Sequence, residues 1–240
     1  MYDKLRGIVL RTIRYTERNN IAHVYTDGRG MMSFLVSTGK GAAARQRQSL
    51  LMPLSLIELQ AHIMPGRDLA TMHDVERYEP LVAIYAEPVR TAIALFLSEL
   101  LWRTIQEQER NDALYRFIEA SVLSLEHMDQ GVANFHLHFL YRLGAYLGIE
   151  PNMETYQQGY WFDMIEGVFV PSPLSMHSLE PDRAAVIRLL DRMTMSNIHL
   201  FRFSHTQRSE VIDTILAYYR LHNASLGTLH SLDVLKQLFV

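Results

Sequence analysis

The chain has 240 residues, of which 48% are hydrophobic and 20% are charged, and its formal net charge is −3. This is the composition of a folded protein with room for one large domain or two smaller ones. There is no cysteine, which excludes disulfides, thiolate zinc sites, iron–sulfur clusters and cysteine nucleophiles. The sequence shows neither a signal-peptide pattern nor an apolar run of the ~18 to 20 residues that a membrane span requires, so we expect a soluble, cytoplasmic protein.

The small net charge hides an asymmetry between the two ends of the chain. Residues 1–60 hold nine Lys or Arg against four Asp or Glu, a balance of +5, whereas the remaining residues hold 14 against 22, a balance of −8. A cluster of cations attracts polyanions, and the commonest polyanion in a cell is nucleic acid. A basic surface that only contacts solvent is the alternative.

Five short segments before residue 80 are rich in β-branched, aromatic and aliphatic residues and are separated by turn residues. DGRG at residues 27–30 supplies a hairpin turn between the second and the third. The longer connection between the third and the fourth contains the cationic stretch GKGAAARQRQ, residues 39–48. Five strands with a long excursion at this place predict an OB-fold β-barrel, and an SH3-like barrel is the alternative. The predicted strands span residues 6–15, 21–27, 30–38, 50–62 and 68–77.

After residue 80 the hydrophobic period becomes that of helices. Pro88 suits the first turn of a helix that runs to about residue 109, and Trp102 in its apolar run is predicted to lie in the core. Residues 149–180 are rich in Gly and Pro and predict a loop or short-strand insertion. The predicted class is α+β, with a barrel domain over 1–80 and an all-α domain over 81–240. The other predicted helices span about 112–129, 131–147, 181–193, 207–221 and 231–238.

A search for catalytic motifs is mostly negative. The sequence has no phosphate loop, no dinucleotide-binding glycine motif and no G-x-S-x-G elbow. His136 and His138 project from different sides of a helix and predict no metal site. Asp163 and Glu166 are three apart, a spacing that on a helix suits acid–base work or Mg²⁺ binding, but the glycines that bracket them favour a turn. A metal-dependent nuclease is therefore the weaker alternative, and we expect no enzyme.

Four segments resemble the RecO family of bacterial recombination mediators. The first begins with GIVLR and ends with the hydrophobic segment LLMPLSLIELQ. Between these lie a tyrosine, a hairpin that ends in glycine, and the basic stretch. The others, in chain order, are FHLHFLYRLGAYLGIEPN, YWFDMIEGVFV and LHSLDVLKQL. Together they extend the resemblance over nearly the whole chain.

The resemblance implies an OB-fold followed by a helical domain, in a protein of DNA repair and recombination. Such a protein binds single- and double-stranded DNA, anneals complementary strands and assists RecA loading onto DNA coated with single-strand binding protein (SSB). The implied partners are RecR and the acidic, hydrophobic C-terminal tail of SSB, and the implied location is the bacterial nucleoid. An OB-fold module that binds RNA or single-stranded DNA in another pathway is the alternative.

This chain departs from the resemblance at one place. Many family members carry a four-cysteine zinc ribbon at the position of about residues 150–180, and a chain without cysteine cannot form it. We therefore expect no zinc and no other cofactor. The insertion is expected to be held by packing of four aromatic residues. These are Tyr160, Trp161, Phe162 and Phe169.

The cationic stretch and the first strand supply the predicted DNA-binding residues. Glycines on both sides of Lys40 allow the backbone to lie close to a ligand. Strict alternation places Arg11 and Arg14 on opposite faces, so that sharing one surface requires a bulge or barrel curvature. Tyr15 and Tyr25 are candidate platforms for base stacking, and Tyr25 is also interpreted as barrel core. The predicted set is Arg11, Arg14, Tyr15, Arg18, Lys40, Arg45 and Arg47.

A second predicted site is for the SSB tail. An acidic peptide with a hydrophobic end requires an apolar pocket with cations at its rim. Phe139 and Leu143 belong to an apolar stripe at helical spacing, for which core packing is the alternative meaning, and Arg142 adjoins them. We therefore predict Phe139, Arg142 and Leu143, with Arg116 and Arg103 as weaker candidates.

Overall fold

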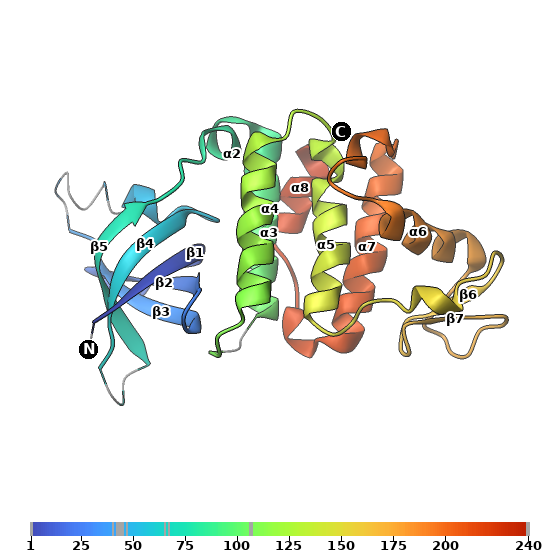
Figure 1. Ribbon diagram of the computed structural model, residues 1–240, viewed down its shortest axis with the longest axis horizontal. Coiled ribbons are helices and arrows are strands. Elements are labelled where there is room, and N and C mark those ends of the chain that lie inside the picture. The colour runs from blue at the N-terminus through green and yellow to red at the C-terminus, as the bar shows by residue number, and fades with distance from the viewer. Residues whose placement is uncertain are drawn as a thin grey trace. The chain divides into compact units, whose positions relative to one another are not determined.

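The computed structural model, drawn in Figure 1, describes residues 2–39, 41, 46, 48–64, 66, 68–105 and 108–238. The chain forms two compact units. The first consists of Met1–His127 with Leu229–Leu235, and the second of Met128–Thr228 with Lys236–Val240. None of the helices in the described ranges combines the length and the apolar character needed to cross a membrane.

The first unit begins with five strands that close into a barrel in the order β1-β2-β3-β5-β4 (Figure 1). β3 and β5 pair in parallel, and the other neighbours pair antiparallel. The closed five-stranded barrel confirms the predicted OB-fold. The strands are β1 (Tyr2–Arg14), β2 (Asn19–Thr26), β3 (Gly30–Ser37), β4 (Leu56–His62) and β5 (Leu69–Arg77).

Buried apolar side chains fill the barrel, because alternate positions of each strand point inward. Val24 and Phe34 are fully buried within this core. Gly7 lies so close to Val24 that a Cβ at position 7 would collide with the valine side chain. The glycine is therefore needed for close packing of β1 on β2.

β4 is shorter than the predicted strand 50–62. Residues 48–50 are helical, and Leu54 has a positive φ of 62°. Pro53 has no N–H to donate to a sheet, so the extended ladder begins only after it. The N–H of Leu54 donates to the carbonyl of Val9 at 2.7 Å, and its side chain is 1% exposed. The apolar run that predicted a strand thus packs against the barrel in another conformation.

Three helices follow the barrel in the first unit: α2 (Val82–Ala86), α3 (Pro88–Thr104) and α4 (Asp112–His127). Pro88 occupies the first turn of α3, as predicted. The carboxylate of Glu126, near the end of α4, accepts hydrogen bonds from the N–H groups of Ala83 and Ile84 at 2.8 and 2.9 Å. These N–H groups lie at the start of α2, where no carbonyl of the same helix can reach them. Glu126 therefore joins α4 to α2.

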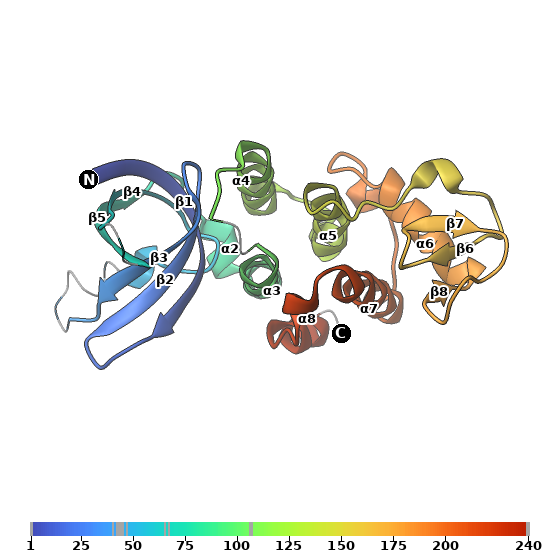
Figure 2. The same cartoon turned by 90° about the horizontal axis from the view of Figure 1, so that it is seen from below.

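The second unit consists of helices and a small sheet of order β7-β6-β8. Figure 2 shows α5 and α7 side by side in this unit. Its elements are α5 (Phe135–Tyr146), β6 (Trp161–Asp163), β7 (Val168–Val170), β8 (Ser178–Leu179), α6 (Pro181–Arg192) and α7 (His205–His222). Single 3-10 turns occur at Val132–Asn134, Met153–Thr155, Ile198–Leu200 and Ala224–Leu226. The last helix described is α8 (Ser231–Leu238), whose residues up to Leu235 belong to the first unit.

The small sheet lies within the predicted insertion and is held by aromatic packing. The rings of Phe162 and Phe169 are 4.9 Å apart, and Phe162 lies 5.6 Å from the ring of Tyr218 on α7. Phe162 and Phe169 are buried, as predicted, whereas Tyr160 and Trp161 are only half-buried.

Candidate nucleic-acid interface

Three arginines project from the end of β1 and the turn that follows it. Arg11, Arg14 and Arg18 are all exposed. The register of β1 against β2 shifts between Val9 and Arg11, which is a bulge in the predicted strand. Beyond the bulge the pairing is regular, so Arg11 and Arg14 still project to opposite sides of β1. Arg11 pairs with His23 on the outer side of the barrel.

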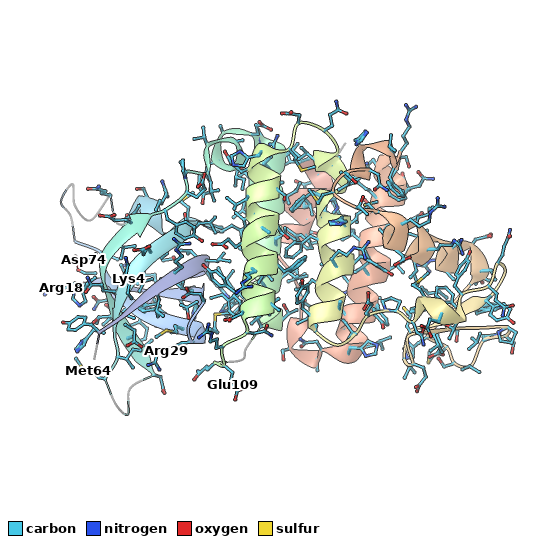
Figure 3. All side chains as sticks on the ribbon, viewed as in Figure 1. Lys4, Arg18, Arg29, Met64, Asp74 and Glu109 are labelled. Carbon is cyan, nitrogen blue, oxygen red and sulfur yellow. The ribbon has the colours of Figure 1, made fainter. Side chains whose placement is uncertain are left out.

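Acidic side chains neutralise the cations near the start of β1. Arg29 donates to Asp3 at 2.7 Å. Glu58 on β4 forms an ion pair with Lys4 and lies 3.7 Å from the guanidinium of Arg6. The three cations Lys4, Arg6 and Arg29 thus share two carboxylates; Figure 3 labels Lys4 and Arg29.

The cations at the end of β1 are not neutralised in this way. In the described part of the chain, Arg11, Arg14 and Arg18 form no ion pair with a carboxylate. The only acid within this stretch of sequence is the exposed Glu17. Figure 3 shows Arg18 at the outer edge of the barrel. Exposed guanidinium groups without an acidic partner can donate charge-assisted hydrogen bonds to phosphates.

The turn between β1 and β2 presents an aromatic ring beside these cations. The side chain of Tyr15 is 59% exposed, and its N–H donates to the carbonyl of Asn19 at 3.0 Å. Tyr25, in contrast, is 1% exposed and packs against the ring of Tyr115 at 6.2 Å. Tyr15 is thus available for base stacking, and Tyr25 belongs to the core.

Lys40, Arg45 and Arg47 lie outside the described residues. The chain nevertheless enters the cationic stretch beside the β1–β2 turn. Thr38, directly after β3, donates its N–H to the carbonyl of Arg18 at 2.8 Å and its hydroxyl to the carbonyl of Glu17 at 3.2 Å.

Trp102 was predicted from the sequence to lie in the core and was not selected as a candidate functional residue. Its indole is half-buried on α3, so the prediction that it lies in the core is wrong. The guanidinium carbon of Arg11 lies 4.1 Å from the centre of its ring, and this cation covers the indole where an apolar neighbour was expected. The sequence offers no signal for this contact, since Trp102 stands in a run of apolar residues.

The residues predicted for the SSB tail do not share a surface. Phe139 and Leu143 are interior side chains of the second unit, 2% and 0% exposed. Arg142 is half-buried and donates from Nη2 to the carbonyls of Asp191 and Met193 at 2.6 and 2.8 Å. It thereby satisfies carbonyls at the end of α6.

An apolar pocket lies beside α5, the helix that carries Phe139, Arg142 and Leu143. It lies among α5, α6, α7 and the small sheet, and its lining is almost wholly apolar. Leu140, Tyr141 and Gly144 line it from α5, and Ile187 and Tyr218 from α6 and α7. The guanidinium of Arg142 lies 5.4 Å from the ring of Tyr141, so a cation stands next to one wall of the pocket.

The acidic pair of the insertion has a structural role. The carboxylate of Asp163 is 1% exposed and accepts hydrogen bonds from the N–H groups of Ile165 and Glu166 and the hydroxyls of Ser175 and Ser178, at 3.0 to 3.2 Å. Burial raises the pKa of Asp163, but these hydrogen bonds outweigh it and hold the pKa below its usual value. Glu166 is exposed.

Nothing in the described ranges favours the nuclease alternative. The hydrogen bonds occupy both oxygens of Asp163, and the pair forms the predicted turn between β6 and β7. Among the residues that the structure describes, no group of three or more His, Asp or Glu is arranged to hold a metal ion.

A closed five-stranded barrel with an unneutralised cationic end, followed by helices, defines an OB-fold protein with an attached helical region. Residues 1–81 match the family model "Recombination protein O N terminal", and residues 86–155 match "Recombination protein O C terminal". The chain belongs to the RecO family of DNA repair and recombination proteins.

Relatives named DNA repair protein RecO match over the full length. The protein from Bacteroides fragilis strain YCH46 is 38% identical over 241 residues, and the protein from Phocaeicola vulgatus is 38% identical over 240 residues, each with 100% of both chains covered. The protein from Porphyromonas gingivalis strain W83 is 34% identical over 239 residues, with 98% of both chains covered.

Proposed function

We propose that the protein binds DNA without sequence preference through a surface that we name the basic edge: Arg11, Arg14, Tyr15 and Arg18. The observation that carries this proposal is the contrast within the barrel. Cations at the start of β1 are paired with acids, whereas those of the basic edge are exposed and have no carboxylate partner among the described residues. Lys40, Arg45 and Arg47 belong to the same proposal because the chain leads into them from Thr38, beside Arg18.

Charge neutralisation explains how such a surface would anneal complementary strands. Two strands repel each other through their phosphates, and arginines that replace the condensed counterions remove part of that repulsion. Contacts to phosphate leave the base edges free to pair. A base stacked on Tyr15 would add about 1 to 3 kcal/mol whatever its identity. None of these steps consumes a nucleotide.

The proposal extends to a mediator role in recombinational repair. In this role the protein acts with RecR to load RecA onto single-stranded DNA that SSB covers. Membership of the RecO family supports these partners. A basic edge that binds the displaced strand and a second unit that binds the SSB tail would together bring the protein to its substrate.

Salt dependence tests the DNA-binding proposal. If about four cations contact phosphate, a plot of log affinity for oligo(dT) against log salt concentration should have a slope near about −3. Replacing both Arg14 and Arg18 with alanine should reduce the slope by about 1.4, since each lost phosphate contact contributes about 0.7. Fluorescence anisotropy of a labelled oligonucleotide measures both quantities.

The matched control is Arg29→Ala, which removes a barrel arginine that Asp3 already neutralises. We expect the control to keep the wild-type slope. A double variant with unchanged affinity and slope would remove Arg14 and Arg18 from the interface. Tighter binding to an RNA oligonucleotide of the same length, without annealing of DNA, would favour an RNA-binding module.

A further inference from the structure

Four side chains of the first unit gather around the indole of Trp102, where β1 and β2 meet α3. We name Arg11, His23, Trp102 and Arg103 the indole cluster. The guanidinium carbons of Arg11 and Arg103 lie 4.1 and 5.3 Å from the centre of the indole ring, and the His23 ring is 5.8 Å away. A cation over the face of an aromatic ring is attracted by the electron density of that face.

The cluster carries a net positive charge. Arg103 lies 3.8 Å from Glu99, whose carboxylate also accepts hydrogen bonds from the N–H and hydroxyl of Ser231 at 2.9 and 2.6 Å. Arg11 has no carboxylate partner in the described ranges. Burial, and next to it the charge of Arg11, lower the pKa of His23, so its imidazole is neutral at pH 7. Of the two arginines in the cluster, Arg11 is therefore the one whose charge no carboxylate neutralises among the described residues.

Stacking on the indole prepares Arg11 for a ligand. A guanidinium that lies over a ring keeps its N–H groups at the edge of its own plane, where they can donate to an anion. Among the described residues, the Arg11 side chain donates to no protein acceptor, and the residue is exposed. Because the indole already restricts this long side chain, less conformational entropy would be lost on binding.

We propose that the indole cluster extends the basic edge onto α3 and binds one nucleotide of single-stranded DNA. The base stacks on the outer face of the Arg11 guanidinium, which Trp102 supports from the other side, and an adjacent phosphate accepts hydrogen bonds from the guanidinium edge. Arg11 and Arg14 are three residues apart on one strand, about 10 Å. Because the two side chains project to opposite sides of β1, the single strand would have to cross over β1 between Arg14 and Arg11. This inference rests on the proposed DNA binding.

Two variants and two ligands separate stacking from simple charge. Arg11→Lys keeps the positive charge and removes the planar group, and Trp102→Leu removes its support. We expect each to weaken binding of oligo(dT) at least about fivefold, the equivalent of about 1 kcal/mol for one stacked base. An abasic oligonucleotide of equal length carries the same phosphates but no bases, and Arg11→Lys should weaken binding of it less than binding of oligo(dT), because only the loss of stacking is specific to the bases.

Indole fluorescence gives an independent readout. The chain has two tryptophans, so Trp161→Phe leaves Trp102 as the only one. Its emission should change in step with the anisotropy of labelled oligo(dT). Wild-type affinity of Arg11→Lys for oligo(dT), together with constant Trp102 emission at saturation, would overturn this inference and leave the proposed DNA binding intact. No binding of any oligonucleotide at low salt would overturn both.

Discussion

The exposed cations of the barrel differ in whether an acidic side chain lies close enough to neutralise them. Arg6 stands opposite Glu58 in the pairing of β1 with β4, and Lys4 reaches the same carboxylate from the same strand. The hydrogen bond from Lys4, and the charges of both cations, hold the pKa of Glu58 below its usual value although burial opposes them. Glu58 therefore stays charged at neutral pH and makes this region a poor site for phosphate. Position on the barrel, more than the number of arginines, decides where a polyanion would bind.

A buried histidine of the second unit makes its stability depend on pH. His136 is 2% exposed, and burial, followed by the charge of Arg208, lowers its pKa to about 3. Its pKa in the unfolded chain is about 6.5, so below that pH the unfolded state takes up a proton that the folded state does not. Stability that is present above pH 6.5 is thus lost as the pH falls toward 3.

We expect the free energy of unfolding to fall by about 2 kcal/mol between pH 6.5 and pH 5 on account of His136 alone. Urea unfolding at the two pH values measures this fall, and the variant His136→Phe should show a fall smaller by that amount. Equal pH dependence in the wild type and the variant would contradict the assignment.

At the scale of elements, single carboxylates join helices that are distant in the chain. Glu126 on α4 accepts from the start of α2, and Arg90 on α3 donates to the carbonyl of Leu125. Asp163 holds the small sheet through four hydrogen bonds. The buried carboxylates of Glu126 and Asp163 each accept several hydrogen bonds. A buried charge is tolerated in a protein when it has such partners.

Removing the Glu126 carboxylate should destabilise the first unit. In Glu126→Ala two N–H groups of α2 lose their acceptor, one of them in the buried interior, and we expect a loss of about 3 kcal/mol. Glu126→Gln keeps one acceptor oxygen and should lose less. The exposed Glu109, labelled in Figure 3, serves as the control, and Glu109→Ala should stay within about 0.5 kcal/mol of the wild type. Urea denaturation followed by tryptophan fluorescence would measure these differences, and equal midpoints for all the variants would refute the role.

On the scale of the whole molecule, local sequence patterns predicted a barrel followed by helices but left an SH3-like barrel open beside the OB-fold. Strand-forming residues between turns before residue 80 and a helical hydrophobic period after it indicated the two parts, and Gly and Pro marked the insertion. The period could not predict how the run at residues 49–54 folds, because Pro53 and the positive φ of Leu54 override its apolar composition. The hydrophobic period also gave a wrong prediction for Trp102. Buried positions occur all around α3, so the pattern does not indicate which face of the helix lies in the core.

The sequence predicted the candidate site only in part, because the site depends on contacts between residues that are distant in the chain. Sequence located the excess of cations but not their neutralisation, which depends on which residues β1 and β4 bring opposite each other. Burial separated Tyr15 from Tyr25, which the sequence left open. Similarly, residues 229–235 join the first unit through Glu99, which is 132 positions from Ser231 in the chain. Contacts over such separations leave no trace in a local pattern.

Binding of the SSB tail concerns the whole molecule, because it would bring the basic edge to DNA that SSB covers. With Arg142 beside one wall of the apolar pocket, we expect Arg142→Glu to weaken binding of a fluorescent SSB tail peptide at least about tenfold, since an attractive charge becomes a repulsive one. The control Arg188→Glu makes the same charge change at an exposed position of the same unit. Thermal unfolding of both variants checks that the loss of the contacts to α6 has not unfolded the protein. Equal peptide affinity in Arg142→Glu and the wild type would exclude this arginine.

Closure of the barrel has a consequence for molecules crowded on one polynucleotide. Each of the five barrel strands has a strand neighbour on both sides. β3 and β5 pair only over Ser33–Leu35 and Leu69–Thr71, so few strand positions remain through which neighbouring copies could add one barrel strand to another, the usual route from high local concentration to fibrous aggregates. Clusters that form along a DNA lattice through this barrel would depend on side chains and should disperse when the salt concentration is raised.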